Sequence, residues 1–150
     1  MTALGLTLSV AESCTGGLIA HRITEIPGAS AFFQLGVVAY SDSSKVKLLG
    51  VREATLRKSG AVSEAVAGEM AVGASRAGNS VCSIGITGIA GPAGGTPEKP
   101  VGTVFIAFYW SGKGVPRVQR VQLHGDRSTI QEEAATHAVC TFLSFIDSLK

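Results

Sequence analysis

The stretch AESCTGG, residues 11–17, decides the fold, because a strand pattern precedes it and a helix pattern follows it. Apolar and polar residues alternate over 6–10, which predicts a β-strand. Over 18–26 the apolar residues recur at helical spacing, and a Pro-Gly pair then ends the helix. Ser13 and Cys14 therefore lie where a strand turns into a helix.

The start of a helix gives this turn two interpretations. Unpaired N–H groups and the positive end of the helix dipole can hold an anion or the oxygen of a tetrahedral intermediate, beside a nucleophile. Ser13 is one candidate nucleophile. Cys14 is its rival, because thiols are the better nucleophiles and a helix start lowers their pKa. Alternatively, Ser13 or Thr15 only caps the helix. The residues alone leave these alternatives open.

Length and composition indicate one globular domain over residues 1–150. Hydrophobic residues make up 45% and charged residues 16% of the chain, which provides a sizeable core and is too apolar for disorder. The net charge of +2, without a basic stripe carrying interleaved aromatic residues, makes a nucleic-acid partner unexpected. The sequence contains neither a signal-peptide pattern nor an apolar run that could span a bilayer, so we expect no membrane partner.

The cysteine and histidine content narrows the chemistry. The three cysteines form no C-x-x-C motif, so neither a disulfide framework nor a zinc site is indicated, and a reducing, cytoplasmic setting is expected. The three histidines have no metal-ligand spacing and no serine partner, which argues against a Ser-His-Asp triad. A serine–lysine pair assisted by a tyrosine is the nucleophilic arrangement that the residues allow.

The remaining chain predicts strands and helices in the order β-α-β-α-α-α-β-β-β-α. This order implies one mixed sheet with helices on both faces and an antiparallel hairpin. The expected elements are a strand that ends near Tyr40, short helices over 41–49 (capped by Ser41) and 52–58, and a longer helix that Ser63-Glu64 opens and Gly78 follows. They continue with strands over 81–87, 101–110 and 116–123, and a last helix over 128–149 with Ser128 and Gln131 in capping-box positions.

Several reactive or anion-binding side chains follow strand ends. If the first three strands are parallel, their carboxyl ends meet at one edge of the sheet, where ligands bind in open α/β sheets. The side chains concerned are Ser13, Tyr40, Lys45, Thr87 and Arg127. Taken singly, each has an ordinary structural interpretation, such as a solvated lysine or an arginine paired with a neighbouring acid. The glycine-rich loop over 88–100 is longer than a simple connection and is a candidate functional loop.

Several motifs, in order over nearly the whole chain, resemble the CinA carboxy-terminal domain family. The motifs are AESCTGG (11–17), Tyr40-Ser41 with Lys45 and LLGV (48–51), GAVS (60–63), and GITGIAGP (85–92) continuing through GGT (94–96) to KPVGTV (99–104). The family includes stand-alone nicotinamide mononucleotide deamidases. The resemblance implies a three-layer α/β/α sandwich with one mixed, mostly parallel sheet, and an amidohydrolase that converts nicotinamide mononucleotide to nicotinic acid mononucleotide and ammonia.

The resemblance also implies roles for individual residues. Ser13 falls on the family's nucleophile and Lys45 on its base, with Tyr40 beside them. The substrate-binding residues that we expect are Cys14, Thr15, Gly16, Thr87, Gly88, Gly91 and Arg127. Backbone N–H groups within 14–17 are expected to hold the oxyanion, and Arg127 with the loop over 88–95 the 5′-phosphate of this pyridine nucleotide.

No metal or organic cofactor is needed for this chemistry. A homodimer is the expected assembly, because closed two-fold symmetry is the commonest. The alternative function is a non-catalytic nucleotide-binding domain, or a competence- or damage-linked interaction domain of the same family.

Overall fold

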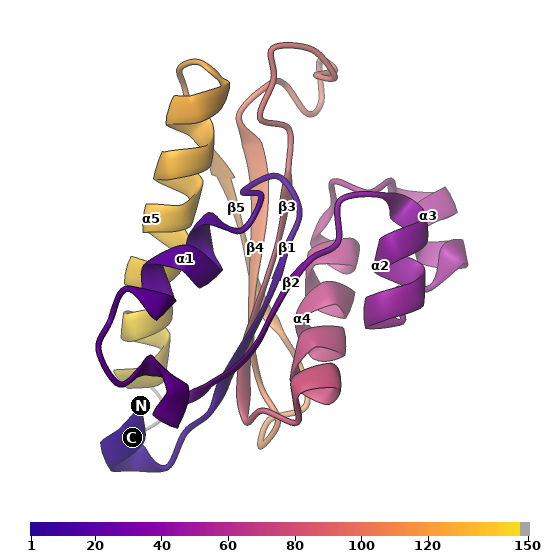
Figure 1. Ribbon diagram of the computed structural model, residues 1–150. Coiled ribbons are helices and arrows are strands. Elements are labelled where there is room, and N and C mark those ends of the chain that lie inside the picture. The colour runs from indigo at the N-terminus through magenta and orange to yellow at the C-terminus, as the bar shows by residue number, and fades with distance from the viewer. Residues whose placement is uncertain (148–150) are drawn as a thin grey trace.

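A five-stranded mixed sheet forms the middle layer of the protein. The computed structural model describes residues 1–147, so the predicted end of the last helix at Leu149 lies outside the described residues. The strands lie in the order β2-β1-β3-β4-β5 (Figure 1). Their bounds are β1 Leu8–Glu12, β2 Phe33–Val38, β3 Cys82–Gly88, β4 Thr103–Trp110 and β5 Arg117–Gln122.

The pairing of the strands confirms that the first three strands are parallel. β1 runs parallel to both β2 and β3, whereas β4 pairs antiparallel with β3 and β5. The carboxyl ends of β1, β2 and β3 consequently lie at one end of the sheet, next to the long loop that joins β3 to β4 (Figure 1). The β4–β5 hairpin is also confirmed.

Helices cover both faces of the sheet, which confirms the three-layer α/β/α sandwich (Figure 1). One face carries α1 and α5, and the other carries α2, α3 and α4. The bounds are α1 Leu18–Thr24, α2 Asp42–Leu49, α3 Glu53–Ser59, α4 Glu64–Gly78 and α5 Arg127–Asp147, with short 3₁₀ helices η1 Thr2–Leu4 and η2 Ala29–Ala31. No helix within residues 1–147 combines the length and the hydropathy that crossing a membrane requires.

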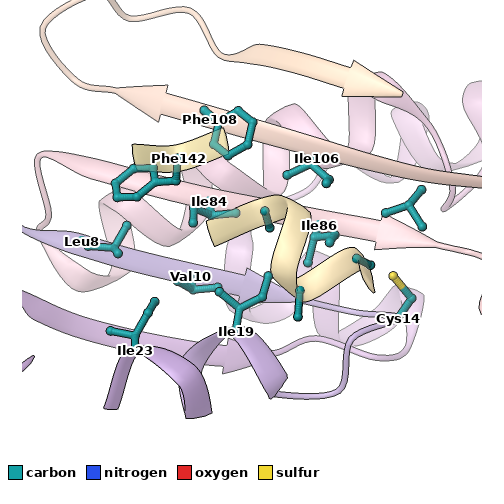
Figure 2. Close-up of a cluster of buried hydrophobic side chains, with 14 of the residues drawn as sticks. Leu8, Val10, Cys14, Ile19, Ile23, Ile84, Ile86, Ile106, Phe108 and Phe142 are labelled. Carbon is teal, nitrogen blue, oxygen red and sulfur yellow. The ribbon is translucent and has the colours of Figure 1, made fainter. Parts of the chain in front are cut away.

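The larger apolar core lies between the sheet and the α1–α5 layer. Figure 2 shows branched and aromatic side chains of β1, β3 and β4 packed against those of the two helices. Alternate residues of each strand point into this core, as the pleat requires. The labelled members are Leu8, Val10, Cys14, Ile19, Ile23, Ile84, Ile86, Ile106, Phe108 and Phe142. Cys14 lies at the edge of this cluster, where the core borders the strand ends.

The predicted helix cap at Ser41 is confirmed, and the one at Ser128 is wrong. The Ser41 and Ser63 hydroxyls accept the N–H groups of Ser44 and Val66 at the starts of α2 and α4. At α5, however, the Asp126 carboxylate accepts the N–H of Thr129 at 2.8 Å. The helix begins at Arg127, so the predicted cap residue Ser128 lies inside the first turn.

A close approach of α4 to the end of α2 supplies a stability test. A Cβ at Gly73 would lie 2.1 Å from the Leu49 carbonyl oxygen, a backbone atom that cannot move aside cheaply. We expect Gly73→Ala to lower the free energy of unfolding by about 2 kcal/mol or more, measured by urea denaturation. The matched control is Gly68→Ala in the same helix, where the nearest atom is 3.6 Å away.

The control has the opposite expected sign. Alanine is the better helix former, so Gly68→Ala is expected to raise the free energy of unfolding by up to about 1 kcal/mol. Equal effects of the two substitutions would show that the Leu49 contact does not limit how closely the helices pack.

Candidate active site

The serine and the lysine that the sequence singles out meet at the carboxyl ends of the parallel strands. Ser13 follows the last residue of β1, is 8% exposed, and donates its N–H to the Ile86 carbonyl of β3 at 3.1 Å. Lys45, from α2, is 1% exposed and donates from Nζ to Ser13 Oγ at 3.1 Å. The candidate nucleophile and the candidate base are thus in hydrogen-bond contact, 32 residues apart in sequence.

Burial prepares Lys45 to act as a base. Desolvation lowers the pKa of Lys45 below its ordinary value of 10.5, although the nearby Asp42 carboxylate opposes the shift. The other two acceptors of Nζ are neutral carbonyl oxygens, of Ala39 at 3.1 Å and Tyr40 at 3.2 Å. Within residues 1–147 no carboxylate lies within 4 Å of Nζ, so its ammonium form has no ion-pair partner. This environment favours the neutral amine.

The structure gives Cys14 the environment of an unreactive thiol. Burial raises the pKa of Cys14 to about 12, with the Glu12 carboxylate adding to the shift. The expectation that the helix start lowers this pKa is therefore not met. The physical reason is that the sulfur lies at the edge of the apolar core, while the first N–H groups of α1 are bonded to Glu12. A protonated thiol is a poor nucleophile, which leaves Ser13 as the better candidate.

Tyr40 and Arg127 form a second contact across the strand ends. Arg127 Nη2 donates to the Tyr40 hydroxyl at 2.6 Å, and Nη1 donates to the Gly91 carbonyl at 2.7 Å. Tyr40 therefore touches Lys45 through its carbonyl and Arg127 through its hydroxyl. Its side chain is 58% exposed, so the ring stands at the mouth of the site.

A cavity of about 260 Å³ lies beside the serine–lysine pair. Eight of the ten predicted site residues line it, namely Ser13, Cys14, Tyr40, Lys45, Thr87, Gly88, Gly91 and Arg127. The remaining lining residues include Asp42, Ala61 and Val62, together with further loop residues. Thr87 is 1% exposed and donates its hydroxyl to the Ala61 carbonyl at 3.0 Å, which joins the end of β3 to the segment before α4.

Thr15 and Gly16 are the two predicted residues that the cavity does not include. The Thr15 hydroxyl donates to Glu12 Oε2 at 2.6 Å, and the Gly16 N–H donates to the Ser13 carbonyl at 3.1 Å. Neither Ser13 nor Thr15 caps α1. The N-cap residue is Gly17, which has no side chain that could accept a hydrogen bond. The Thr15 hydroxyl and the Gly16 N–H therefore form hydrogen bonds within the turn that carries Ser13.

Free backbone donors lie in the glycine-rich loop that lines the cavity. Within the described chain, the N–H groups of Ala90, Gly91 and Gly94 have no hydrogen-bond acceptor. Those of Cys14 and Thr15 donate to no backbone carbonyl and face the Cys14 sulfur. The Gly17 N–H, by contrast, is bonded to Glu12. The expected oxyanion donors over 14–17 are thereby reduced to Cys14 and Thr15.

The glycine-rich loop over 88–100 forms the roof of the cavity and is braced to its wall. Lys99 donates from Nζ to the carbonyls of Ser59 at 3.0 Å and Val62 at 2.7 Å, in the segment between α3 and α4. Arg127 holds the same loop at Gly91. The loop, the segment between α3 and α4, and the start of α5 are distant in sequence and are joined around the cavity by these hydrogen bonds.

Sequence reasoning missed two residues that contact the nucleophile turn. The Glu12 carboxylate accepts hydrogen bonds from the turn and from α1, and Gln131 of α5 donates from Nε2 to the Cys14 carbonyl at 2.7 Å. A charged residue at the end of a fully buried strand is the one sequence signal that could have identified Glu12. Gln131 gave no such signal, because it looks like a helix-capping residue.

The fold and the site together define a class: an α/β/α domain with a buried serine–lysine pair at the carboxyl ends of its parallel strands. The family described as CinA C-terminal domain matches residues 1–146. The chain belongs to this family.

Individual relatives and solved structures agree. A CinA-like protein of Kosmotoga olearia is 52% identical over 90% of this chain, which spans about a third (32%) of that relative's length. The nicotinamide-nucleotide amidohydrolase PncC of Escherichia coli K12 is 48% identical over 94% of this chain and 85% of its own. The crystal structure of competence damage-inducible protein A (ComA) of Klebsiella pneumoniae superimposes with a TM-score of 0.94 at 34% identity, covering 99% of this chain and 91% of that one.

Proposed function

We propose that this protein is a nicotinamide mononucleotide deamidase, which hydrolyses the carboxamide of nicotinamide mononucleotide to give nicotinic acid mononucleotide and ammonia. The observation that carries the proposal is the buried contact between Ser13 Oγ and Lys45 Nζ beside a cavity with free N–H donors. The similarity to PncC, whose name states this class of activity, supports the choice of substrate.

The proposed reaction begins with attack of Ser13 Oγ on the carboxamide carbon. Neutral Lys45 takes the hydroxyl proton as the new C–O bond forms. The N–H groups of Cys14 and Thr15 stabilise the negative oxygen of the tetrahedral intermediate. Lys45 then gives its proton to the amide nitrogen, the C–N bond breaks, and ammonia leaves an acyl ester on Ser13.

Hydrolysis of the ester completes the cycle. Water loses a proton to Lys45 and attacks the ester carbon, and Ser13 leaves as its hydroxyl with that proton, so no cofactor is consumed. Tyr40 helps through two contacts, its carbonyl on Lys45 and its hydroxyl on Arg127. A proton relay through the Tyr40 hydroxyl stays a prediction.

The substrate's two polar ends have separate places in this proposal. The carboxamide lies at Ser13, with Thr87 and Gly88 beside it on the end of β3. The 5′-phosphate lies at Arg127, whose guanidinium suits paired hydrogen bonds, and at the N–H groups of the loop near Gly91.

The direct test is to incubate the purified protein with nicotinamide mononucleotide and to measure ammonia and nicotinic acid mononucleotide together. Stoichiometric release of both supports the deamidase. A folded protein whose melting temperature rises with the nucleotide, but which releases no ammonia, would instead be a binding domain.

Arg127→Gln tests the place of the phosphate. We expect this substitution to raise the KM for nicotinamide mononucleotide about 10- to 100-fold, because a charge-assisted hydrogen bond to the phosphate is lost. Nicotinamide riboside, which lacks the phosphate, provides the control substrate, and its kinetics are expected to change much less. Equal losses with both substrates would show that Arg127 acts only through Tyr40 and Gly91.

A further inference from the structure

The Glu12 carboxylate is the most enclosed charged group near the proposed nucleophile. Glu12 is the last residue of β1 and is 0% exposed. Its Oε2 accepts hydrogen bonds from Thr15 Oγ1 at 2.6 Å, Gly17 N at 3.1 Å and Ile19 N at 3.1 Å, and its Oε1 accepts from Ala20 N at 2.8 Å. All four partners are donors, which is the pattern of an ionised carboxylate.

A short polar side chain at the N-cap of α1 would accept its N–H groups with a smaller desolvation penalty than the buried Glu12 carboxylate. Burying a carboxylate without a cation is expensive, and within residues 1–147 Glu12 has no ion-pair partner. Helices are usually capped by a short polar side chain at the N-cap position itself, where this chain has Gly17. The cap comes instead from the strand, on the far side of the turn that carries Ser13.

This placement fixes the turn and not only the helix. Gly16 and Gly17 have φ values of +64° and +106°, so the turn contains two consecutive residues with little conformational preference of their own. Hydrogen bonds from Glu12 to both the middle of the turn and the first residues of α1 select one conformation. In sequence, Ser13 lies between Glu12 and the residues that Glu12 bonds, which begin at Thr15.

The same contacts remove a competing binding mode. A helix N-terminus attracts anions, and α1 begins four residues after Cys14, which lines the cavity. Because Glu12 occupies the N–H groups of Gly17, Ile19 and Ala20, this end of α1 is not free to hold the substrate's phosphate. The phosphate is left to the Arg127 side of the cavity.

We propose that Glu12 is a positioning residue for the deamidase: by bonding the turn and the start of α1, its carboxylate holds Ser13 Oγ against Lys45 Nζ. Lys45 is fixed independently by the carbonyls of Ala39 and Tyr40. The candidate nucleophile and base are thus held by two separate groups of contacts. Glu12 acts on the Ser13 turn together with the Ile86 carbonyl and Gln131. The kinetic part of this inference rests on the proposed function.

Glu12→Gln is the main test, because it keeps the shape of the side chain and removes an acceptor. The amide nitrogen would face an N–H donor of α1, so the turn has to rearrange. We expect kcat for ammonia release to fall about 100-fold, as displacement of a reacting group by about 1 Å does. The KM is expected to stay within about threefold, because Arg127 and the loop near Gly91, which are proposed to hold the phosphate, have no hydrogen bond to Glu12. Glu12→Asp, which keeps the charge on a shorter stem, is expected to restore part of kcat.

A matched variant separates positioning from loss of stability. Arg22, on α1, bonds Glu132 and Thr136 of α5, away from the turn. Arg22→Leu is expected to lower the melting temperature but to leave kcat unchanged. Comparable losses of kcat in Arg22→Leu and Glu12→Gln at the same fall in melting temperature would overturn the proposal, as would wild-type kcat in Glu12→Gln.

A crystal structure of Glu12→Gln gives a readout that needs no activity. The expected result is that Ser13 Oγ and Lys45 Nζ separate beyond hydrogen-bond distance, compared with 3.1 Å here. An unchanged turn and contact would overturn the proposal. If the wild-type protein releases no ammonia, the proposed function fails, and the crystal structure alone then decides the role of Glu12.

Discussion

Replacing Ser13 with alanine is expected to lower kcat for ammonia release from nicotinamide mononucleotide by at least about 10⁴-fold, as loss of the nucleophile does in serine hydrolases. The side chain is small and almost fully enclosed, and within residues 1–147 its hydroxyl forms a hydrogen bond with Lys45 alone. The variant should therefore fold normally and still bind the nucleotide. Steady-state kinetics, with a binding isotherm for the same variant, provides the measurement.

Cys14→Ser is the control for this experiment, because the two side chains are adjacent. The raised pKa of Cys14 keeps its thiol protonated, so we expect this variant to retain turnover within about tenfold of wild type. The reverse result, with turnover lost in Cys14→Ser and kept in Ser13→Ala, would make the thiol the nucleophile.

Lys45→Met is expected to have opposite effects on activity and stability. Methionine has a similar length and no charge, so kcat should fall about 10³-fold through loss of the base. Stability should be kept or should increase, because a buried ammonium without an ion-pair partner is removed. Lys47→Met, on the exposed side of the same helix, is the matched control and should leave kcat unaltered.

The pH dependence of stability and activity follows from the lowered pKa of Lys45. Burial lowers the pKa of Lys45 in the folded chain, so the unfolded chain binds this proton more tightly. Below its lowered pKa, the buried Lys45 ammonium lowers the free energy of unfolding by its full amount. This loss disappears as the pH rises toward 10.5, the ordinary pKa of lysine. Activity should likewise increase with pH through the lowered pKa. A melting temperature of Lys45→Met far below wild type at pH 7 would contradict this account.

The sequence predicted the order of the elements and the meeting of the strand ends, because both depend on local periodicity and on rules of α/β topology. Ser41 was recognised as a cap, since it lies three residues from the N–H that it accepts. The strand-end positions brought Ser13 and Lys45 into one site, and the family resemblance supplied their roles.

The errors and omissions concern contacts that no local pattern encodes. Lys45 stands in a polar stretch and looks solvated, yet it is buried and bonded to Ser13, Ala39 and Tyr40. Glu12 reaches residues up to eight positions ahead, across a turn whose course depends on glycine conformations. The start of α5 differs from the prediction by one residue, which was enough to assign its cap to Ser128 in place of Asp126.

The braced loop over 88–100 has a consequence for how enzymes of this architecture can diverge. Within residues 1–147 no hydrogen bond joins this loop to Ser13 or Lys45, although it forms the roof above them. Its supports include Lys99, attached to the segment before α4, Arg127, attached from α5, and Arg120 of β5, which donates to the Glu98 carbonyl. Mutations in the loop can thus remodel the cavity while the reacting pair stays in place, so that natural selection can alter substrate choice and bond cleavage independently.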